Sequence, residues 1–546
     1  MNFTDKILWS WLIGGLAFRA LIAYFLPAGF DEAYYFLYTQ NIDWSYFDHP
    51  PAVAWSAGAG IWLTGVVSPL TLRLGALGLY TGSLWLLYAV GRQLFDSKVG
   101  IMSCAIATLS PLFFLSFGTL AAPDNALIFF WSLALYLCTL EFFPVHPSPY
   151  VPTPRICLIA IALGLACLGK YHGFLLALSI CGFCAFTRPY RKALFSKWTG
   201  IGVVLFALTV FPIFYWNARH GWISFLFQLG DRFAEYGDQS SSYSLSALLG
   251  VWLAQLGYLF PSLGIPLWWV SLQTLFRQIL FRQSLFKQSL FTQGLVTHDR
   301  YTRAQKASAL DNDRLSFLLW SGFPVAICFT LLGGATHTFP AWPAPGLWSL
   351  TGLLGYAAAR WPQRAVRRWL SSTGWAIAVL LLIALSHISF GTLQQAGRYA
   401  PFGGVVAIEQ DPSTQLIDTV QLRQKLSQSN EFWDAIAASQ VVLTPTYWLS
   451  GYIAMSMPAG VSLPISSFTP DPRGLAFWHT SAAWLGKNAL FITLENDAQT
   501  ALNSLSPYFE SIVPMSKIAT QRGGEASNTV CLYEAKNLIK PYPYPY

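Results

Sequence analysis

Acidic side chains and a histidine gather within nineteen residues near the N-terminus of the chain. Asp31 and Glu32 are adjacent, and Asp48 and His49 follow in an aromatic stretch that ends in two prolines. Crowded carboxylates at the edge of a low-dielectric region raise one another's pKa or hold a cation, and either outcome suits a general base. The alternative is a solvated loop whose acids cap a helix that begins at Ala33.

Two further ionisable residues stand at the ends of apolar runs. Asp124 follows Pro123 and could line the same cavity as the first acids, or it could only cap a helix. Lys170 lies between two short apolar runs, where its ammonium group could bind a phosphate or extend to the membrane surface. Arg19 lies roughly 10 Å inside the first apolar run at about 1.5 Å per residue, so we expect it to pair with an acid or a lipid phosphate.

Four more polar residues complete the set of candidates: Asn217, Arg219, His220 and His337. With the acids they could form a metal site of histidine and carboxylate ligands, although their spacing matches no known metal fingerprint. The sequence has no Walker loop, no dinucleotide-binding glycine motif and no zinc-protease motif. Nucleotide and zinc-protease chemistry therefore gain no support.

The composition indicates that these residues belong to a membrane protein. Of the 546 residues, 54% are hydrophobic and only 11% are charged, against about 25% charged in soluble domains. Several apolar runs approach the roughly 20 residues that cross a bilayer. A soluble globular protein, a disordered chain, a fibre and a protein with a single membrane anchor are excluded.

The basic residues indicate topology rather than binding to nucleic acid. The formal net charge is +8, but residues 393–546 hold nine basic and eleven acidic residues, so the excess of positive charge lies in the membrane region. We expect about eleven spans, near 7–26, 72–91, 99–119, 124–141, 156–169, 172–187, 198–216, 245–270, 315–333, 343–359 and 373–392. Basic residues collect in alternate gaps, so the positive-inside rule predicts a cytoplasmic N-terminus and an outer C-terminus.

Two segments need a separate interpretation. Residues 51–66 are apolar, but a span there would invert every later basic loop, so we predict an interfacial helix. Residues 271–312 repeat apolar and polar pairs at helical spacing, which predicts a basic amphipathic helix on the inner leaflet or a solvated linker helix.

The fold class expected is therefore an all-α polytopic membrane domain, residues 1–392, followed by a small extracytoplasmic α/β domain, residues 393–546. Runs rich in β-branched residues at Val441–Thr444, Ala489–Leu494 and Thr529–Tyr533 predict strands, and residues 414–428 predict a helix. The final proline–tyrosine repeat predicts a disordered tail.

The motifs resemble those of GT-C glycosyltransferases of family 39, which include the protein O-mannosyltransferases, and more distantly the lipid A aminoarabinose transferase of family 83. The resemblance covers the membrane region to about residue 350 and also includes Leu485–Phe491. The residues that carry it are Asp31–Tyr35, Tyr46–Pro51, Pro123–Ala126, Gly169–Tyr171 and Trp216–Trp222.

The resemblance implies transfer of a sugar from undecaprenyl or dolichyl phosphate to a lipid, glycan or protein acceptor outside a bacterial inner membrane. Asp31 then corresponds to the general base, and Glu32 is its catalytic motif partner, which would position the acceptor or tune Asp31. Arg19, Lys170 and Arg219 would offset the charge on the departing phosphate.

The resemblance leaves open a divalent metal cation, for which the candidate ligands are Asp31, Asp124 and His337. The lipid A enzyme has Lys-Pro where this chain has His49-Pro50, which argues against lipid A as the acceptor.

The main alternative to an enzyme is a multi-pass transporter or lipid flippase, because charged residues in a membrane also suit a substrate path. Transporters of this kind have internal repeats and polar residues near the middle of the membrane. Here the polar residues crowd the outer face and no repeat is found, which favours the enzyme.

Overall fold

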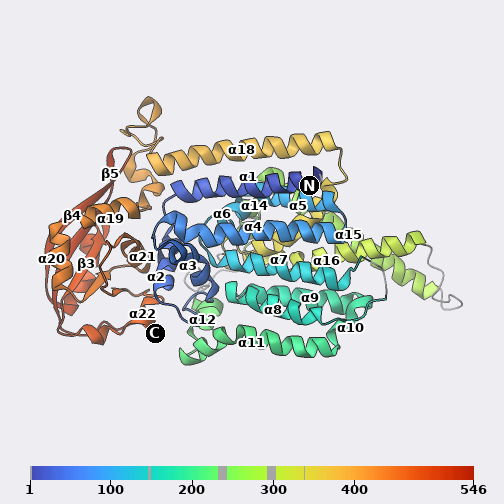
Figure 1. The fold of residues 1–546 in the computed structure, drawn as a ribbon, viewed down its shortest axis with the longest axis horizontal. Helices are drawn as coiled ribbons and strands as arrows, with labels where there is room; N and C mark the ends of the chain where they lie inside the picture. Colours follow the sequence, from blue (N-terminus) through green and yellow to red (C-terminus); the bar gives the residue numbers. More distant parts are fainter. Residues whose placement is uncertain (1–2, 146–148, 232–242, 292–302, 337) are drawn as a thin grey trace.

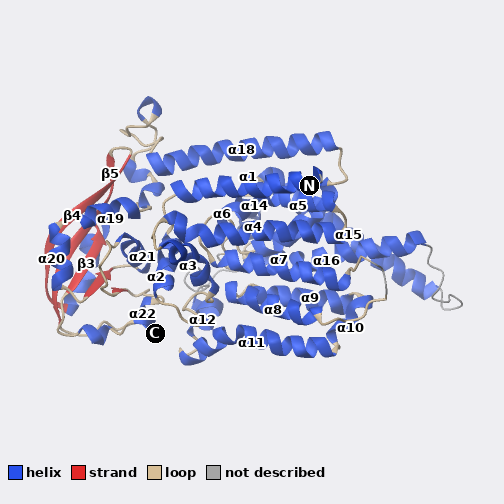
Figure 2. Cartoon of the chain, in the orientation of Figure 1, coloured by secondary structure: helices blue, strands red, loops and turns tan. Residues whose placement is uncertain are grey.

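The computed structural model describes residues 3–145, 149–231, 243–291, 303–336 and 338–546. A long bundle of helices makes up most of the molecule, and all the strands lie together at one end of it (Figures 1 and 2). We call this end of the bundle the domain end and the opposite one the far end.

The bundle is built from apolar helices that run between the two ends (Figure 1). Most of each predicted span is helical, which confirms the all-α polytopic fold class, although the span expected at 99–119 is broken at Ser110. Within the described ranges, six helices are long and apolar enough to cross a membrane, or up to eight if each of two bent pairs is one span. The helices are α1 (Phe3–Phe25), α4 (Pro69–Leu94), α5 (Ser97–Leu109), α6 (Pro111–Ser116), α7 (Pro123–Phe142), α8 (Arg155–Gly169), α9 (Gly173–Phe186), α11 (Lys197–Arg219), α14 (Leu245–Leu259), α15 (Pro261–Phe291), α16 (Arg303–Leu332), α17 (Ala344–Ala358) and α18 (Gln363–Phe390).

The span expected at 245–270 is a bent pair of helices, not one straight helix. Helices α14 and α15 meet at a bend of 117°. Phe260, between them, has a φ of 74°, and the next residue, Pro261, has no N–H to continue the helix and starts a new one.

The amphipathic helix expected at 271–312 is also corrected. Helix α15 continues without a break to Phe291, and α16 begins at Arg303, so no separate helix lies along an inner leaflet in the described part of this segment. Both helices project past the far end of the bundle (Figure 1). Residues 292–302 lie outside the described ranges.

The first loop, residues 27–71, folds into a layer between the bundle and the sheet (Figure 1). It contains α2 (Phe30–Gln40) and α3 (Ala52–Thr64). The 13 residues of α3 are too few to cross a bilayer. Helix α3 packs closely on α4, since a Cβ on Gly75 would lie 2.0 Å from the carbonyl oxygen of Ser56.

The C-terminal region forms a mixed five-stranded sheet with the strand order β2-β1-β3-β5-β4. The pairs β1–β2 and β1–β3 are parallel, whereas β3–β5 and β4–β5 are antiparallel. The predicted strands are present, the last as part of a longer one. The elements are α19 (Thr419–Ser427), α20 (Asn430–Ala438), β1 (Val441–Thr444), α21 (Tyr447–Ser456), β2 (Ile465–Ser467), α22 (Leu475–Trp478), β3 (Ala489–Leu494), α23 (Ala498–Leu505), β4 (Phe509–Arg522) and β5 (Glu525–Leu538).

The final proline–tyrosine repeat is ordered, so the prediction of a disordered tail is wrong. Tyr542 stacks on Phe468 with ring centroids 4.8 Å apart, and Tyr546 packs on Phe47 of the first loop at 4.7 Å. The prolines hold the chain extended, and the tyrosines between them supply large apolar rings that pack on the domain.

Candidate active site

A cavity of about 710 Å³ opens at the domain end of the bundle. Its lining includes five residues expected from the sequence: Asp31, Glu32, His49, Asp124 and Lys170. They come from α2, the first loop, α7 and the end of α8. Residues up to 139 positions apart along the chain therefore contribute to one site.

Asp31 and Glu32 differ sharply in their surroundings, although they are neighbours. Both lie in the first turn of α2, where the positive end of the helix dipole favours carboxylates. The Asp31 side chain is exposed and lines the cavity, whereas Glu32 is 3% exposed.

Glu32 forms a bidentate ion pair with Arg73 of α4. The Nε and Nη2 atoms of Arg73 donate to the two carboxylate oxygens at 2.8 and 2.5 Å. The carboxylate also accepts the backbone N–H groups of Gly29 and Ala121 at 2.9 and 2.8 Å. A buried carboxylate with this many donors is held in one position.

Arg73 extends this network to the end of α1. Its Nη1 donates to the carbonyl oxygens of Ala23 and Leu26, and its Nη2 donates to that of Pro27. The guanidinium therefore joins α1, α2 and α4 directly behind Asp31. Sequence reasoning missed Arg73, because it stands inside a predicted span with no local partner.

Asp124 and Lys170 form a second ion pair at the cavity. The Nζ of Lys170 lies 2.9 and 3.1 Å from the two carboxylate oxygens, and each side chain is 15% exposed. Helices α7 and α8 meet closely here, since a Cβ on Gly169 would lie 2.4 Å from the backbone nitrogen of Leu127. The close approach sets the end of α8 beside the start of α7.

Asp48 and His49, the other motif pair of the first loop, face different surroundings. Asp48 is buried and accepts hydrogen bonds from the Tyr38 hydroxyl and from Nη1 of Arg473, the latter at 3.3 Å. His49 is buried at the cavity, where its ring packs edge-on against Tyr35. The proline-rich end of the loop thus places Asp48 against the C-terminal region and His49 at the cavity.

Arg19 is buried away from the cavity. Its Nη2 donates to the Thr81 hydroxyl at 2.8 Å, and its guanidinium lies over the Tyr80 ring at 4.7 Å. Among the described residues it has no ion pair, so the acid expected as its partner is not found there. Arg19 does not line the candidate site.

The candidates around residue 220 also lie outside the cavity lining. Asn217 caps the local turn by accepting the N–H of Ser224, and the His220 ring stacks on Trp216. Arg219 is exposed and donates to the Tyr215 hydroxyl. His337 lies outside the described residues.

A divalent cation is held by several ligands that lie close together. No group of three histidine, cysteine or carboxylate side chains that could hold a metal occurs among the described residues. Asp124 directs both oxygens to Lys170, so this part of the donor set does not fit a cation.

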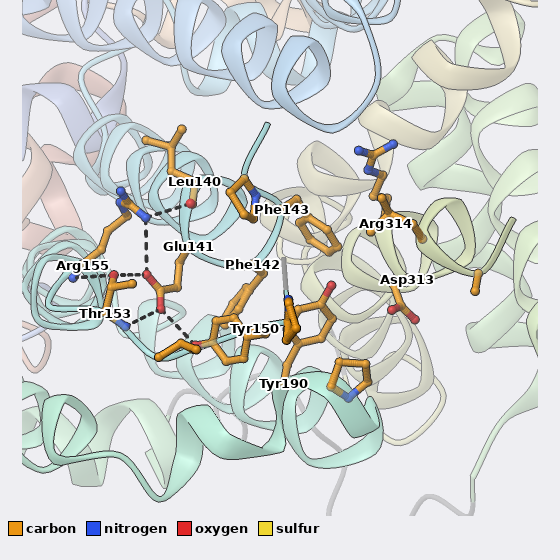
Figure 3. Close-up of a pocket in the computed structure, with 16 residues that line it drawn as sticks. Leu140, Glu141, Phe142, Phe143, Tyr150, Thr153, Arg155, Tyr190, Asp313 and Arg314 are labelled. Atoms are coloured by element: carbon orange, nitrogen blue, oxygen red, sulfur yellow. Dashed lines mark hydrogen bonds and ion pairs between the residues drawn. The ribbon is translucent and has the colours of Figure 1, made fainter. Parts of the chain in front are cut away.

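A second cavity, of about 600 Å³, lies at the far end of the bundle (Figure 3). Its buried carboxylate, Glu141, accepts hydrogen bonds from the Tyr150 hydroxyl and from the N–H and hydroxyl of Thr153, and it pairs with Arg155 at 3.4 Å. These contacts tie the connection after α7 to the start of α8. Glu141 is therefore a structural carboxylate, separated from Asp124 by the length of α7.

The comparisons with known proteins agree with this architecture. The model of the family described as dolichyl-phosphate-mannose-protein mannosyltransferase matches residues 48–216. The apo structure of ArnT from Cupriavidus metallidurans is similar over 97% of this chain and 98% of that chain, with 14% identity and a TM-score of 0.59. The structure of the same protein bound to undecaprenyl phosphate covers the same shares, with 14% identity and a TM-score of 0.57.

The oligosaccharyltransferase of Archaeoglobus fulgidus in complex with zinc and sulfate is similar over 94% of this chain and 72% of that chain, with 11% identity and a TM-score of 0.45. Among curated proteins, none matches this sequence. The likeness to ArnT confirms the GT-C fold expected from the sequence, and the family-model match supports the expected class of enzyme, a membrane glycosyltransferase.

Proposed function

We propose that this chain transfers a sugar from a polyprenyl-phosphate carrier to an acceptor at the outer face of the membrane. The observation that carries the proposal is the cavity in which an exposed carboxylate, Asp31, and a cation, Lys170, line the same space at the domain end. One group suits the acceptor hydroxyl and the other suits a lipid phosphate. The solved ArnT complex with undecaprenyl phosphate supports a carrier of this chemistry.

In the proposed reaction, Asp31 takes the proton of the acceptor hydroxyl. The acceptor oxygen forms a bond to the anomeric carbon of the sugar while the bond from that carbon to the phosphate oxygen breaks. Lys170 offsets the charge of the departing polyprenyl phosphate. Because a phosphate leaves without strong protonation, one essential carboxylate is enough, unlike the two acids of glycoside hydrolysis.

Glu32 has a supporting role in this proposal. Its ion pair with Arg73 and its two backbone hydrogen bonds hold the first turn of α2. That turn carries Asp31, so the pair positions the base without touching the substrate.

The proposal also fixes the orientation of the chain. The N-terminus would be cytoplasmic and the C-terminal domain, residues 393–546, would be periplasmic, since basic residues fill the loops at the far end. The cavity would then open on the outer face, next to the outer leaflet. A donor carried by a membrane lipid can reach this position, whereas a soluble nucleotide sugar remains in the cytoplasm.

Turnover of purified protein in liposomes tests the proposal. Radiolabelled undecaprenyl-phosphate and dolichyl-phosphate sugars are supplied in the lipid, and release of polyprenyl phosphate by transfer or hydrolysis is measured. We expect turnover with at least one donor. Absence of turnover with every donor, together with movement of labelled lipid between leaflets, would contradict the proposal and favour a flippase.

A further inference from the structure

The C-terminal domain contributes its own side chains to the lining of the cavity. Tyr447 and Trp448 are the first two residues of helix α21, and Arg473 lies two residues before α22. Each is half-buried, and each keeps a hydrogen-bond donor that engages no described residue: the Tyr447 hydroxyl, the Trp448 indole N–H and the Nη2 of Arg473. None of these three atoms is among the buried polar atoms that have no hydrogen-bond partner, so each is accessible from the cavity or the solvent.

The surrounding structure fixes Arg473 in place. Its Nη1 donates to Asp48 at 3.3 Å, its Nε donates to Asp471 at 3.2 Å, and the guanidinium lies over the Tyr447 ring at 4.3 Å. Burial opposes the positive charge, but Asp48, Tyr447 and Asp471 raise the pKa of Arg473 above its ordinary value. The side chain is therefore a charged and immobile donor.

The backbone of Arg473 adds independent evidence of a functional constraint. Its φ is 48°, in the left-handed region that residues other than glycine sparsely populate. The N–H of the next residue, Gly474, donates to the Tyr34 hydroxyl at 2.9 Å, so a contact to α2 maintains the conformation. Backbone strain of this kind persists where the surroundings require it, and here it directs a guanidinium to the cavity.

We infer, on the basis of the function proposed above, that Tyr447, Trp448 and Arg473 form the subsite for the sugar of the donor. The lipid phosphate at Lys170 sits at the end of a membrane helix, so the sugar must extend from the phosphate away from the lipid tail. The C-terminal domain lies in that direction (Figure 1). A sugar offers many oxygen atoms to N–H and O–H donors and apolar ring faces to aromatic side chains.

This assignment gives the C-terminal domain a part in the selection of the sugar. The two charged side chains that line the cavity from the start of α7 and the end of α8, Asp124 and Lys170, bond to each other. Those from the C-terminal domain retain free donors. Recognition of the carrier and of its sugar is thereby divided between the two parts of the chain.

Binding of two lipid probes separates these roles. The probes are undecaprenyl phosphate, which has no sugar, and the undecaprenyl-phosphate sugar that the wild type turns over. For Arg473→Met we expect the dissociation constant of undecaprenyl phosphate to stay within about twofold, while that of the sugar-bearing lipid rises about tenfold. Tyr447→Phe removes only a hydroxyl. It should also weaken binding of the sugar-bearing lipid relative to undecaprenyl phosphate, but by a smaller factor.

If Arg473 served only to neutralise Asp48, a different result would be expected. The double variant Arg473→Met/Asp48→Asn removes the carboxylate that the single variant leaves without its cation. We expect the double variant to keep the loss of sugar preference. The single variant Asp48→Asn gives the reference preference for the sugar-bearing lipid over undecaprenyl phosphate. If the double variant showed this same preference, the assignment of Arg473 to the sugar subsite would be overturned.

Other outcomes are equally decisive. Equal weakening of both probes in Arg473→Met, or no weakening of either together with an unchanged Tyr447→Phe, would overturn the sugar subsite. A wild type that binds neither probe would instead contradict the proposed function.

Discussion

Gly451 of α21 packs against Ala33 of α2 so closely that a Cβ on Gly451 would lie 2.2 Å from the Ala33 carbonyl oxygen. Ala33 follows directly after Asp31 and Glu32. The helix that carries the candidate base is thus in backbone contact with the C-terminal domain. We expect the domain to be a working part of the site.

Substitution of Gly451 by alanine tests this contact. Since the clash is with backbone atoms, α2 or α21 must shift, at a cost of about 1–3 kcal/mol. We expect a lower midpoint of thermal denaturation and reduced sugar transfer. Gly78→Ala on the exposed face of α4 is the control, because a Cβ there meets nothing within 4 Å. Equal behaviour of the two variants would show that the contact is unimportant.

The buried pair of Glu32 and Arg73 predicts strong coupling between the two residues. Removal of one partner leaves an uncompensated buried charge and should destabilise the protein by about 3–5 kcal/mol. We therefore expect Glu32→Gln and Arg73→Met each to lower thermal stability, and the double variant to recover part of the loss. If Glu32→Gln were as stable as the wild type but inactive, Glu32 would have a chemical role instead.

We expect the affinity for the lipid carrier to depend on Lys170. Lys170→Met removes the cation at the cavity, and we expect undecaprenyl phosphate to bind at least about tenfold more weakly. The double variant Lys170→Met/Asp124→Asn, which leaves no unpaired carboxylate, controls for folding and should bind as weakly. Unchanged binding in both variants would exclude Lys170 from the phosphate site.

We expect the C-terminal domain to lose stability in acid because of Asp411. Burial would raise the pKa of Asp411, but hydrogen bonds from Ser413 and Arg522 outweigh it and hold the pKa below its ordinary value. A depressed native pKa stabilises the fold above the unfolded value, about 3.9, and this contribution is lost as the pH falls through the native pKa.

Thermal denaturation of wild type and Asp411→Asn between pH 7 and pH 3 measures this contribution. We expect the variant to be less stable at pH 7 and the difference to shrink below about pH 4. Asp434→Asn is the control, since Asp434 is exposed and bonds to no described residue. A difference that stays constant down to pH 3 would contradict the assignment.

The sequence allowed prediction of those parts of the site that depend on local features. Asp31, Asp124 and Lys170 stand near the ends of apolar runs. Because membrane helices end at the membrane surface, such residues lie at the same depth and can line one cavity. Arg73 and Arg473 could not be found in this way. Their partners, Glu32 and Asp48, are 41 and 425 positions away, and only the packed structure brings them together.

The errors in the predicted fold have a similar origin. Hydropathy measures apolar length, so it does not report the reversal at Phe260 or the continuation of α15 past the bundle. The tyrosines of the C-terminal tail are ordered by Phe468 and by Phe47 of the first loop. Neither ring is near the tail in the sequence, and composition alone indicated disorder.

If Asp31 is the general base, Asp31→Asn removes the proton acceptor while it keeps the size of the side chain. Transfer from the undecaprenyl-phosphate sugar and binding of undecaprenyl phosphate are measured on the same preparation. Asp43→Asn is the matched control, because Asp43 lies in the same loop but bonds to the Trp216 indole. We predict that Asp31→Asn lowers transfer by roughly 10²–10⁴-fold and leaves binding within about twofold. Transfer by folded Asp31→Asn at the rate of Asp43→Asn would show that Asp31 is not the general base.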